Sequence, residues 1–205
     1  MAHSTYEKLV TAAAVMFHKQ GYAVTSISEI LELAGVPRGS LYHHFPGGKQ
    51  ALAIAAAWQS SDLVVTLIRT SFETAREEGK DFKEAIRLIC NSFASKYESE
   101  DRWQYSPVSG MLLDPTGGEG FHDVTQAIYR VWRQVFIAQS KTFGVTDEQA
   151  LLIAKKLSII LEGAWVMSRA TEKSDPFFQA AAFMMPCTKA ILAGDDPDCG
   201  QLVGR

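Results

Sequence analysis

The sequence predicts an all-α protein, in which a small N-terminal head of three helices is joined by a long helix to a larger helical domain. Apolar residues recur at spacings of three and four over most of the chain, and capping residues with Gly or Pro separate these stretches. Past Gly48 no stretch shows the alternation typical of a strand. We therefore expect about nine helices. The predicted parts are a helix-turn-helix head at 1–50, a second domain at 51–193 and a flexible tail at 194–205.

The first helix is predicted to begin after Ser4. Ser4 and Glu7 have the spacing of a capping box, in which a hydroxyl and a carboxylate satisfy each other's free backbone N–H groups. Gly21 is suited to end the helix. The apolar stripe between these ends consists of Tyr6, Leu9, Val10, Ala13 and Phe17.

The second helix repeats this pattern over a shorter distance. Ser26 and Glu29 form another capping-box pair. Gly35 supplies the left-handed conformation that ends a helix, and Pro37 suits the first turn of the next one. The predicted buried stripe is Ile27, Ile30, Leu31 and Ala34.

The third helix carries almost no acid, and its apolar anchors are predicted to be Leu41 and Phe45, which share one face. Its other side chains then point outward. This is the layout of a helix-turn-helix, in which one helix braces the next for a DNA groove. The predicted DNA-binding residues are Thr25, Ser26, Arg38, Gly39, Ser40, Tyr42, His43, His44 and Lys49.

These residues suit different parts of a duplex. Arg38 and Ser40 can reach base edges, and Gly39 lets the backbone lie close to DNA. The tyrosine and histidines suit phosphates or a thymine methyl group. Lys49 follows two glycines at the start of a long helix, where an ammonium and a helix N-terminus together favour a phosphate.

The head resembles the DNA-binding domain of the tetracycline-repressor (TetR) family of bacterial transcription regulators. The run GSLYHHFPGGK is further similar to the branch of multidrug-resistance regulators that answer to lincomycin-like drugs or flavonoids. The resemblance implies a homodimer that binds operator DNA and responds to a small lipophilic effector. It is carried by Phe17, Gly21, Thr25, Ile30, Ala34, Gly35, Leu41, Tyr42, His44, Phe45 and Lys49.

Beyond the head the sequence reads as helical almost throughout. Thr146 with Gln149 caps one of the later helices, and Asp175-Pro176 opens the last. The stretch 99–120 is rich in Gly and Pro and is expected to hold one short helix. The expected helices cover about 48–77, 82–98, 106–113, 120–143, 147–171 and 176–193.

The last two helices are candidates for a dimer interface. The final one is apolar almost all round, which in a single chain would leave apolar surface exposed unless the helix is central. Pairing both helices with those of a second copy forms a four-helix bundle. The alternative is that both helices are buried within one chain. The predicted interface residues are Ala154, Leu157, Leu161, Phe178 and Phe183.

Aromatic residues are dense between the head and these helices. Each of them alone is more often ordinary core, but Trp and Tyr need partners for their polar atoms, and together they suggest a ligand cavity. The predicted ligand-binding residues are Phe93, Tyr97, Trp103, Tyr105, Met111, Phe121, Tyr129, Trp132, Phe136 and Trp165.

Other chemistries find little support in the sequence. His122-Asp123 and His43-His44 have no nucleophile motif beside them, so we expect no enzyme, and no cofactor or metal site is predicted. The cysteines Cys90, Cys187 and Cys199 lack paired spacing, which fits a reducing cytoplasm. No apolar run approaches the roughly 18 residues of a membrane helix, and no leader is expected.

Net charge adds one constraint on the predicted function. The chain carries −3 overall, while residues 1–50 hold four Lys/Arg against three Asp/Glu. A weakly basic head binds DNA modestly, so two heads are needed. We therefore predict a cytoplasmic, dimeric repressor that a lipophilic or aromatic molecule releases from a pseudo-palindromic operator. The alternatives are a constitutive DNA-binding regulator with a filled core and, remotely, a helical enzyme.

Overall fold

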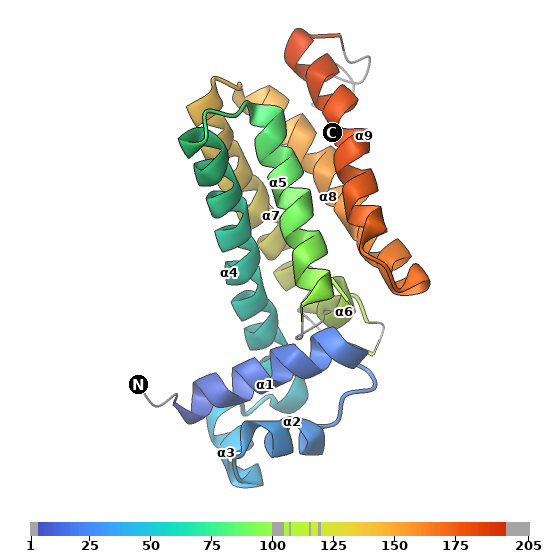
Figure 1. The fold of residues 1–205 in the computed structure, drawn as a ribbon. Coiled ribbons are helices and arrows are strands. Elements are labelled where there is room, and N and C mark those ends of the chain that lie inside the picture. The colour runs from blue at the N-terminus through green and yellow to red at the C-terminus, as the bar shows by residue number, and fades with distance from the viewer. Residues whose placement is uncertain (1–3, 100–104, 107, 115, 119, 196–205) are drawn as a thin grey trace. The chain divides into compact units, whose positions relative to one another are not determined.

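The computed structural model describes residues 4–99, 105–106, 108–114, 116–118 and 120–195. Within these ranges the chain is all helical, with nine α-helices and one short 3-10 helix (Figure 1). Most bounds agree with the sequence prediction to within a few residues. The helices are α1 (Thr5–Gln20), α2 (Ile27–Ala34), α3 (Arg38–His44), α4 (Gly48–Glu77), α5 (Phe82–Glu98), α6 (Ser109–Leu112), α7 (Phe121–Ser140), η1 (Lys141–Phe143), α8 (Asp147–Thr171) and α9 (Asp175–Ala193).

Helix ends follow the predicted capping residues. The capping boxes Ser4/Glu7, Ser26/Glu29 and Thr146/Gln149 all form. Gly35 takes the left-handed conformation at φ 64°, which ends α2 where the sequence predicts. Pro37 is the residue before α3 rather than part of its first turn, so that helix starts one residue later than expected.

The chain divides into two compact units, and the division differs from the predicted domains. Unit 1 comprises residues 1–64 with 100–129, and unit 2 comprises 65–99 with 130–205. Besides the predicted head at 1–50, unit 1 thus includes residues 51–64 and the described residues between 105 and 129. Residues 196–205, most of the predicted tail, lie outside the described residues.

Unit 1 is built around α1, which packs on α2, α3 and α6 (Figure 1). Its centre is apolar, with Leu9, Phe17, Ile30, Leu41 and Leu52 wholly buried. Two polar contacts fasten α1 to α4 beside this core. The His18 ring Nε2 lies 2.9 Å from the Ser60 hydroxyl, and the Gln59 amide donates to the Thr11 hydroxyl at 3.1 Å.

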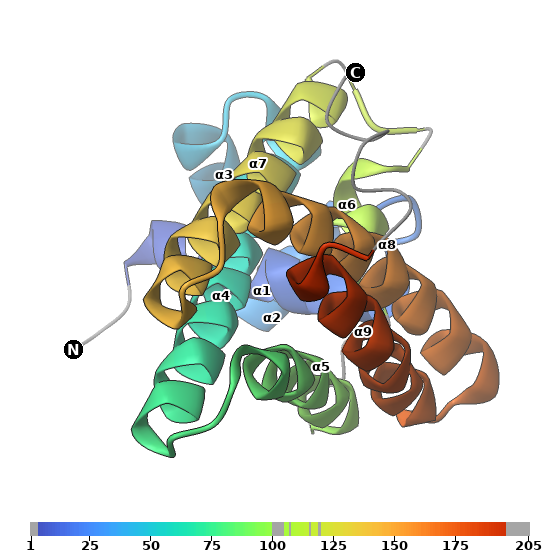
Figure 2. The same ribbon diagram turned by 90° about the horizontal axis from the view of Figure 1, so that it is seen from above.

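Unit 2 holds α9 beside both α5 and α8 (Figure 2). One side of α9 is buried and consists of Phe177, Ala180, Ala181, Met184, Thr188 and Ile191. The opposite side is open, because Phe178 and Phe183 are exposed. The all-round apolar sequence of α9 therefore divides into an inner face and an uncovered outer face.

Among the helices in the described part of the chain, α4 alone has the length and composition of a membrane span, with a segment of mean hydropathy 1.5. This corrects the expectation that no apolar run is long enough. Gln59, Ser60 and Ser61 interrupt the apolar residues of α4, but the Ala, Leu, Ile and Val residues around them keep its mean hydropathy high. The signal is weak, because core helices pass the same test and 44% of the segment is buried.

Candidate nucleic-acid interface

The outward face of α3 is the first feature of this site. Arg38, Gly39, Tyr42 and His43 are exposed, and Ser40 and His44 are partly exposed. Leu41 and Phe45 are buried, as predicted, and hold the helix against the rest of unit 1. The helix therefore presents a guanidinium, a hydroxyl, a phenol and an imidazole on one exposed strip, the donor types that contact bases and phosphates.

Tyr6 of α1 lies beside this strip, although the sequence analysis assigned it to the buried stripe of the first helix. Its ring stacks on Phe45 with centroids 5.0 Å apart and meets His44 edge-on at 6.2 Å. It remains 44% exposed, so its hydroxyl adds a further polar group to the surface. Its place at the start of the stripe, next to the helix end, was the available signal.

Thr25 corrects the predicted set. Its side chain is only 1% exposed, and its hydroxyl donates to the Gly21 carbonyl at 2.7 Å. A hydroxyl that is buried and bonded in this way fixes the turn between α1 and α2 and is not free to contact DNA. Ser26 is exposed, but its oxygen accepts the Glu29 N–H at 3.2 Å as the cap of α2.

Lys49 stands at the start of α4, as predicted, but it already has partners within unit 1. Its Nζ lies 4.3 Å from the centroid of the Tyr22 ring and donates to the Ala23 carbonyl at 3.4 Å. Burial lowers the pKa of the Lys49 ammonium, and the carboxylates of Asp114 and Glu29 act in the opposite direction.

The predicted ligand-binding residues fall into both units. Unit 1 contains Tyr105, Met111, Phe121 and Tyr129. Phe121 packs against the turn between α1 and α2, because its ring meets the Tyr22 ring edge-on with centroids 5.2 Å apart. Trp103 lies outside the described residues. The residues in unit 2 are Phe93, Tyr97, Trp132, Phe136 and Trp165.

Three of these residues form one aromatic cluster in unit 2. Phe93, Tyr97 and Trp165 surround Phe177, which the sequence analysis did not select, with centroids 5.0 to 6.4 Å apart. The Tyr97 hydroxyl donates to the Ser168 carbonyl at 2.7 Å. Phe136 belongs to a different cluster with Phe72, Phe82 and Phe143. Trp132 is partly buried on α7.

The predicted dimer interface is partly corrected. Ala154 and Leu157 are 3% and 5% exposed because they face the interior of their own chain, so they have no surface for a partner. Leu161 is partly exposed, and Phe178 and Phe183 are exposed. The uncovered face of α8 is instead formed by residues that the prediction passed over, Ile159, Gly163, Val166 and Met167.

An apolar groove of about 240 Å³ lies between α8 and α9 on this uncovered side. On α8 the groove is open at Gly163, which has no side chain, and on α9 it is bordered by the exposed ring of Phe183. The lining is Ile160, Gly163, Ala164, Met167, Pro176, Gln179, Ala180 and Phe183. A groove beside an exposed ring has the shape that lets the side chains of one helix pack between those of another helix.

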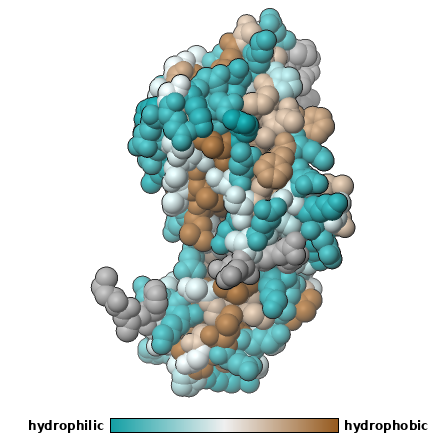
Figure 3. All heavy atoms as spheres, viewed as in Figure 1, coloured by the Kyte–Doolittle hydropathy of each residue, from teal (hydrophilic) through white to brown (hydrophobic). Residues whose placement is uncertain are grey.

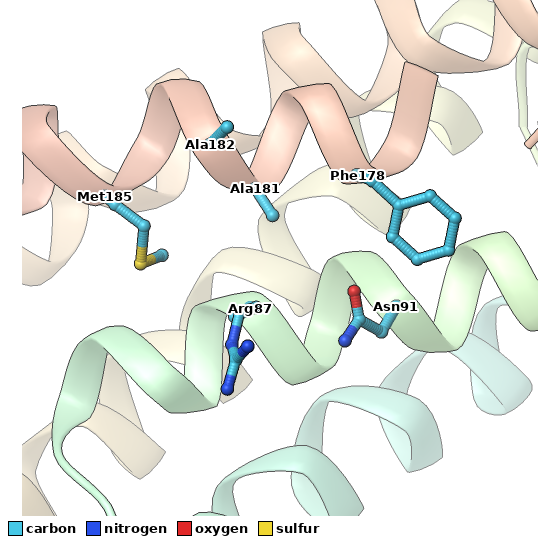
Figure 4. A pocket seen from close by; sticks show the side chains of 6 residues that line it. All are labelled: Arg87, Asn91, Phe178, Ala181, Ala182 and Met185. Atoms are coloured by element: carbon cyan, nitrogen blue, oxygen red, sulfur yellow. The ribbon is translucent and has the colours of Figure 1, made fainter. Parts of the chain in front are cut away.

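A second groove, of about 310 Å³, lies between α5 and α9 (Figure 4). Phe178 and Met185 point from α9 toward α5, and Asn91 points back from α5. The Arg87 guanidinium at its edge donates to the Glu84 carboxylate one turn earlier, so its charge is already balanced. Apolar side chains gather over α9 on this face of the surface (Figure 3).

Comparison with known proteins adds two family matches. Residues 9–56 match the model of bacterial regulatory proteins of the tetR family. Residues 83–183 match the C-terminal domain of LmrA/YxaF-like transcriptional regulators. The two matches together include the helix-turn-helix and most of unit 2.

Similar proteins cover nearly the whole chain. The uncharacterized regulator YxaF of Bacillus subtilis is 30% identical over 85% of this chain and 90% of its own length. The regulator LmrA of the same organism is 27% identical, over 86% and 92%. A TetR regulator from Legionella pneumophila has the same fold, with a TM-score of 0.75 at 18% identity, over 91% of this chain and 98% of that one.

These matches define a helix-turn-helix transcriptional regulator, a DNA-binding protein rather than an enzyme. The chain belongs to the TetR family and carries a C-terminal domain of the LmrA/YxaF type. Both the family and the branch that the sequence of the head indicates are therefore confirmed.

Proposed function

We propose that this protein is a cytoplasmic, homodimeric repressor that binds a pseudo-palindromic operator and leaves it when a small lipophilic or aromatic effector binds. The observation that carries the proposal is the outward face of α3, with Arg38, Ser40, Tyr42 and His43 at its surface. Leu41 and Phe45 anchor the opposite face of α3 in the core of unit 1, so the exposed face of α3 is available to enter a major groove.

A dimer is supported by the outer face of α8 and α9. Ile159, Val166, Met167 and Phe183 are 74%, 67%, 53% and 70% exposed, an amount of apolar surface that single chains rarely leave in water. The groove beside Phe183 offers a place for the same ring of a second copy, as a two-fold interface requires. Two weakly basic heads then act together on one operator.

An effector site is supported by the aromatic cluster of α5, α8 and α9. The Ser168 hydroxyl beside it is wholly buried and has no hydrogen-bond partner among the described residues. A buried hydroxyl without a partner is costly, so a ligand that pairs with it gains specificity. The close ring contacts would equally suit a permanently filled core, which keeps a constitutive regulator as the second candidate.

The DNA-binding role is tested with Arg38→Ala and Lys49→Ala on a duplex that the wild-type protein selects from a random pool. Arg38→Ala should cost about 1–3 kcal/mol and relax specificity at one base step of each half-site. Lys49→Ala should weaken binding to all DNA sequences by a similar factor. It should also reduce the slope of log binding constant against log salt concentration by roughly 0.9 for each lost phosphate contact.

Arg87→Ala in unit 2 is the matched control, since it also removes one guanidinium but lies outside the head. It should leave DNA affinity unchanged. Unaltered affinity in both Arg38→Ala and Lys49→Ala would remove this surface from consideration.

A further inference from the structure

Tyr105, Gly110 and Asp114 are hydrogen-bonded to the end of α1 and to the turn that joins α1 to α2. The Tyr22 N–H donates to the Gly110 carbonyl at 3.1 Å, and the Tyr105 N–H donates to the His18 carbonyl at 3.2 Å. The N–H of Ala23 donates to Asp114 Oδ2 at 3.3 Å. All of these residues belong to unit 1, so they are part of the same compact body as the helix-turn-helix.

Asp114 is held in its ionised form by this arrangement. Its Oδ1 accepts the Thr116 hydroxyl at 2.5 Å and the Thr116 N–H at 2.8 Å, while Oδ2 accepts from Ala23. These bonds, with a smaller contribution from Lys49, lower the pKa of the Asp114 carboxyl below its usual value. A fixed negative charge therefore lies at the turn between α1 and α2.

Lys49 extends to the same turn. Its ammonium lies over the Tyr22 ring and donates to Ala23, the residue whose N–H bonds Asp114. The ring, the carbonyl and the carboxylate all favour a cation at this position. A DNA phosphate at the start of α4 would need the same ammonium, and it would have to draw Lys49 away from these partners.

We propose that Asp114 is a positioning residue that restrains Lys49 and thereby lowers the affinity of the head for DNA. The inference rests on the proposed function, because it treats Lys49 as the phosphate-binding lysine of the head. Asp114 competes with the phosphate for one ammonium group. The charge of the carboxylate, rather than its shape, is the property that carries the effect.

The test uses the full-length protein and Asp114→Asn, which removes the charge and keeps one acceptor oxygen. Binding is measured by fluorescence anisotropy on a labelled random-sequence duplex, because phosphate contacts act on all sequences. Asp114→Asn should tighten binding about threefold in the wild-type background. In the Lys49→Met background the same substitution should leave affinity unchanged, because its only partner in this effect is gone.

Glu32→Gln is the matched control. It also removes one carboxylate from unit 1, but it lies on α2 outside the contacts of Lys49. It should give the same small change with Lys49 or Met at position 49. The Cε signal of Lys49 in NMR titrations reports the electrostatic interaction with Asp114 without DNA, since Asp114→Asn should lower the pKa of Lys49 further.

The possible outcomes separate this inference from the proposed function. Equal gains in both backgrounds would indicate general charge repulsion and overturn the inference. If Lys49→Met weakens DNA binding but Asp114→Asn has no effect, the inference that Asp114 restrains Lys49 is wrong. The proposed DNA-binding role of Lys49 then stands. If the wild-type protein binds neither random nor selected duplexes, the proposed function itself fails and the inference falls with it.

Discussion

Glu29 and Ser26 hold the start of α2 through a reciprocal pair of hydrogen bonds. The Ser26 N–H donates to Glu29 Oε2 at 2.7 Å, and the Ser26 hydroxyl accepts the Glu29 N–H at 3.2 Å. The bond from the Ser26 backbone, then that from its hydroxyl, lowers the pKa of the Glu29 carboxyl. The ionised form is thus favoured in the folded state, and this contribution to stability depends on pH.

We predict that Glu29→Gln destabilises the protein at neutral pH and that the difference disappears in acid. A lowered folded-state pKa gives stability that is present above the unfolded value of about 4.3 and is lost as the pH falls through the folded value. Urea unfolding of the wild-type protein and of Glu29→Gln, at pH values from neutral to below the folded pKa, measures the difference in unfolding free energy. Glu32→Gln, on the same helix but outside the capping box, is the control. A difference that stays constant into acid would contradict the prediction.

Single residues also show what sequence reasoning can and cannot recover. The outward positions of Arg38, Tyr42 and His43 follow from the spacing of Leu41 and Phe45, and the structure agrees. Thr25 could not be placed in this way, because its burial depends on a bond to Gly21 across a turn. Asp114 lies far from Lys49 in sequence, and no periodic pattern relates them.

At the scale of elements, α8 and α9 each have two apolar faces with different roles. The inner face of α8 contains Ala154 and Leu157, and its outer face contains Ile159 and Val166. Helical periodicity finds both stripes but does not tell which one meets the same chain. The prediction chose the inner stripe of α8 for the dimer. Capping residues depend on local chemistry alone, which is why helix ends were predicted more reliably than helix faces.

We predict that Phe183→Glu yields a folded monomer. The side chain is 70% exposed in one subunit, so a carboxylate there costs the monomer little, but it would be buried without a partner in a dimer. Sedimentation equilibrium gives the mass, and circular dichroism checks the helical content. The wild-type protein should be a dimer at micromolar concentration.

Leu157→Ala is the matched substitution on the inner face. It should lower the unfolding free energy by roughly 2–5 kcal/mol while the protein stays dimeric. The opposite pattern, with a dimeric Phe183→Glu and a dissociated Leu157→Ala, would place the interface on the inner stripe of α8 and exclude the outer face.

For the whole molecule, the helical class and the order of helices follow from local patterns, whereas the two compact units do not. Unit 1 combines the first 64 residues with 100–129, a pairing of distant segments that depends on contacts such as Tyr22 with Phe121. The candidate effector residues were predicted as one group, but the contacts divide them. Aromatic composition indicates burial and does not indicate which rings meet.

The proposed switch makes a prediction that links effector and DNA in both directions. A lipophilic compound that binds at Phe93, Tyr97 and Trp165 should quench tryptophan fluorescence and weaken operator binding. Operator DNA must then weaken the compound by the same factor, because coupling between two sites is reciprocal. Shifting the protein from 1:99 to 99:1 between two states needs about 5.5 kcal/mol, which two sites in a dimer can share.

Trp165→Phe separates this switch from a constitutive regulator. It keeps a ring in the cluster and removes the indole N–H, so it should reduce compound affinity and induction while operator affinity without the compound stays the same. Titrations of the compound with and without the selected duplex measure both the affinity for the compound and the loss of operator binding. A compound that binds tightly in this cluster and leaves operator affinity untouched would show that the cluster is core rather than switch. The constitutive regulator would then be the better description of the protein.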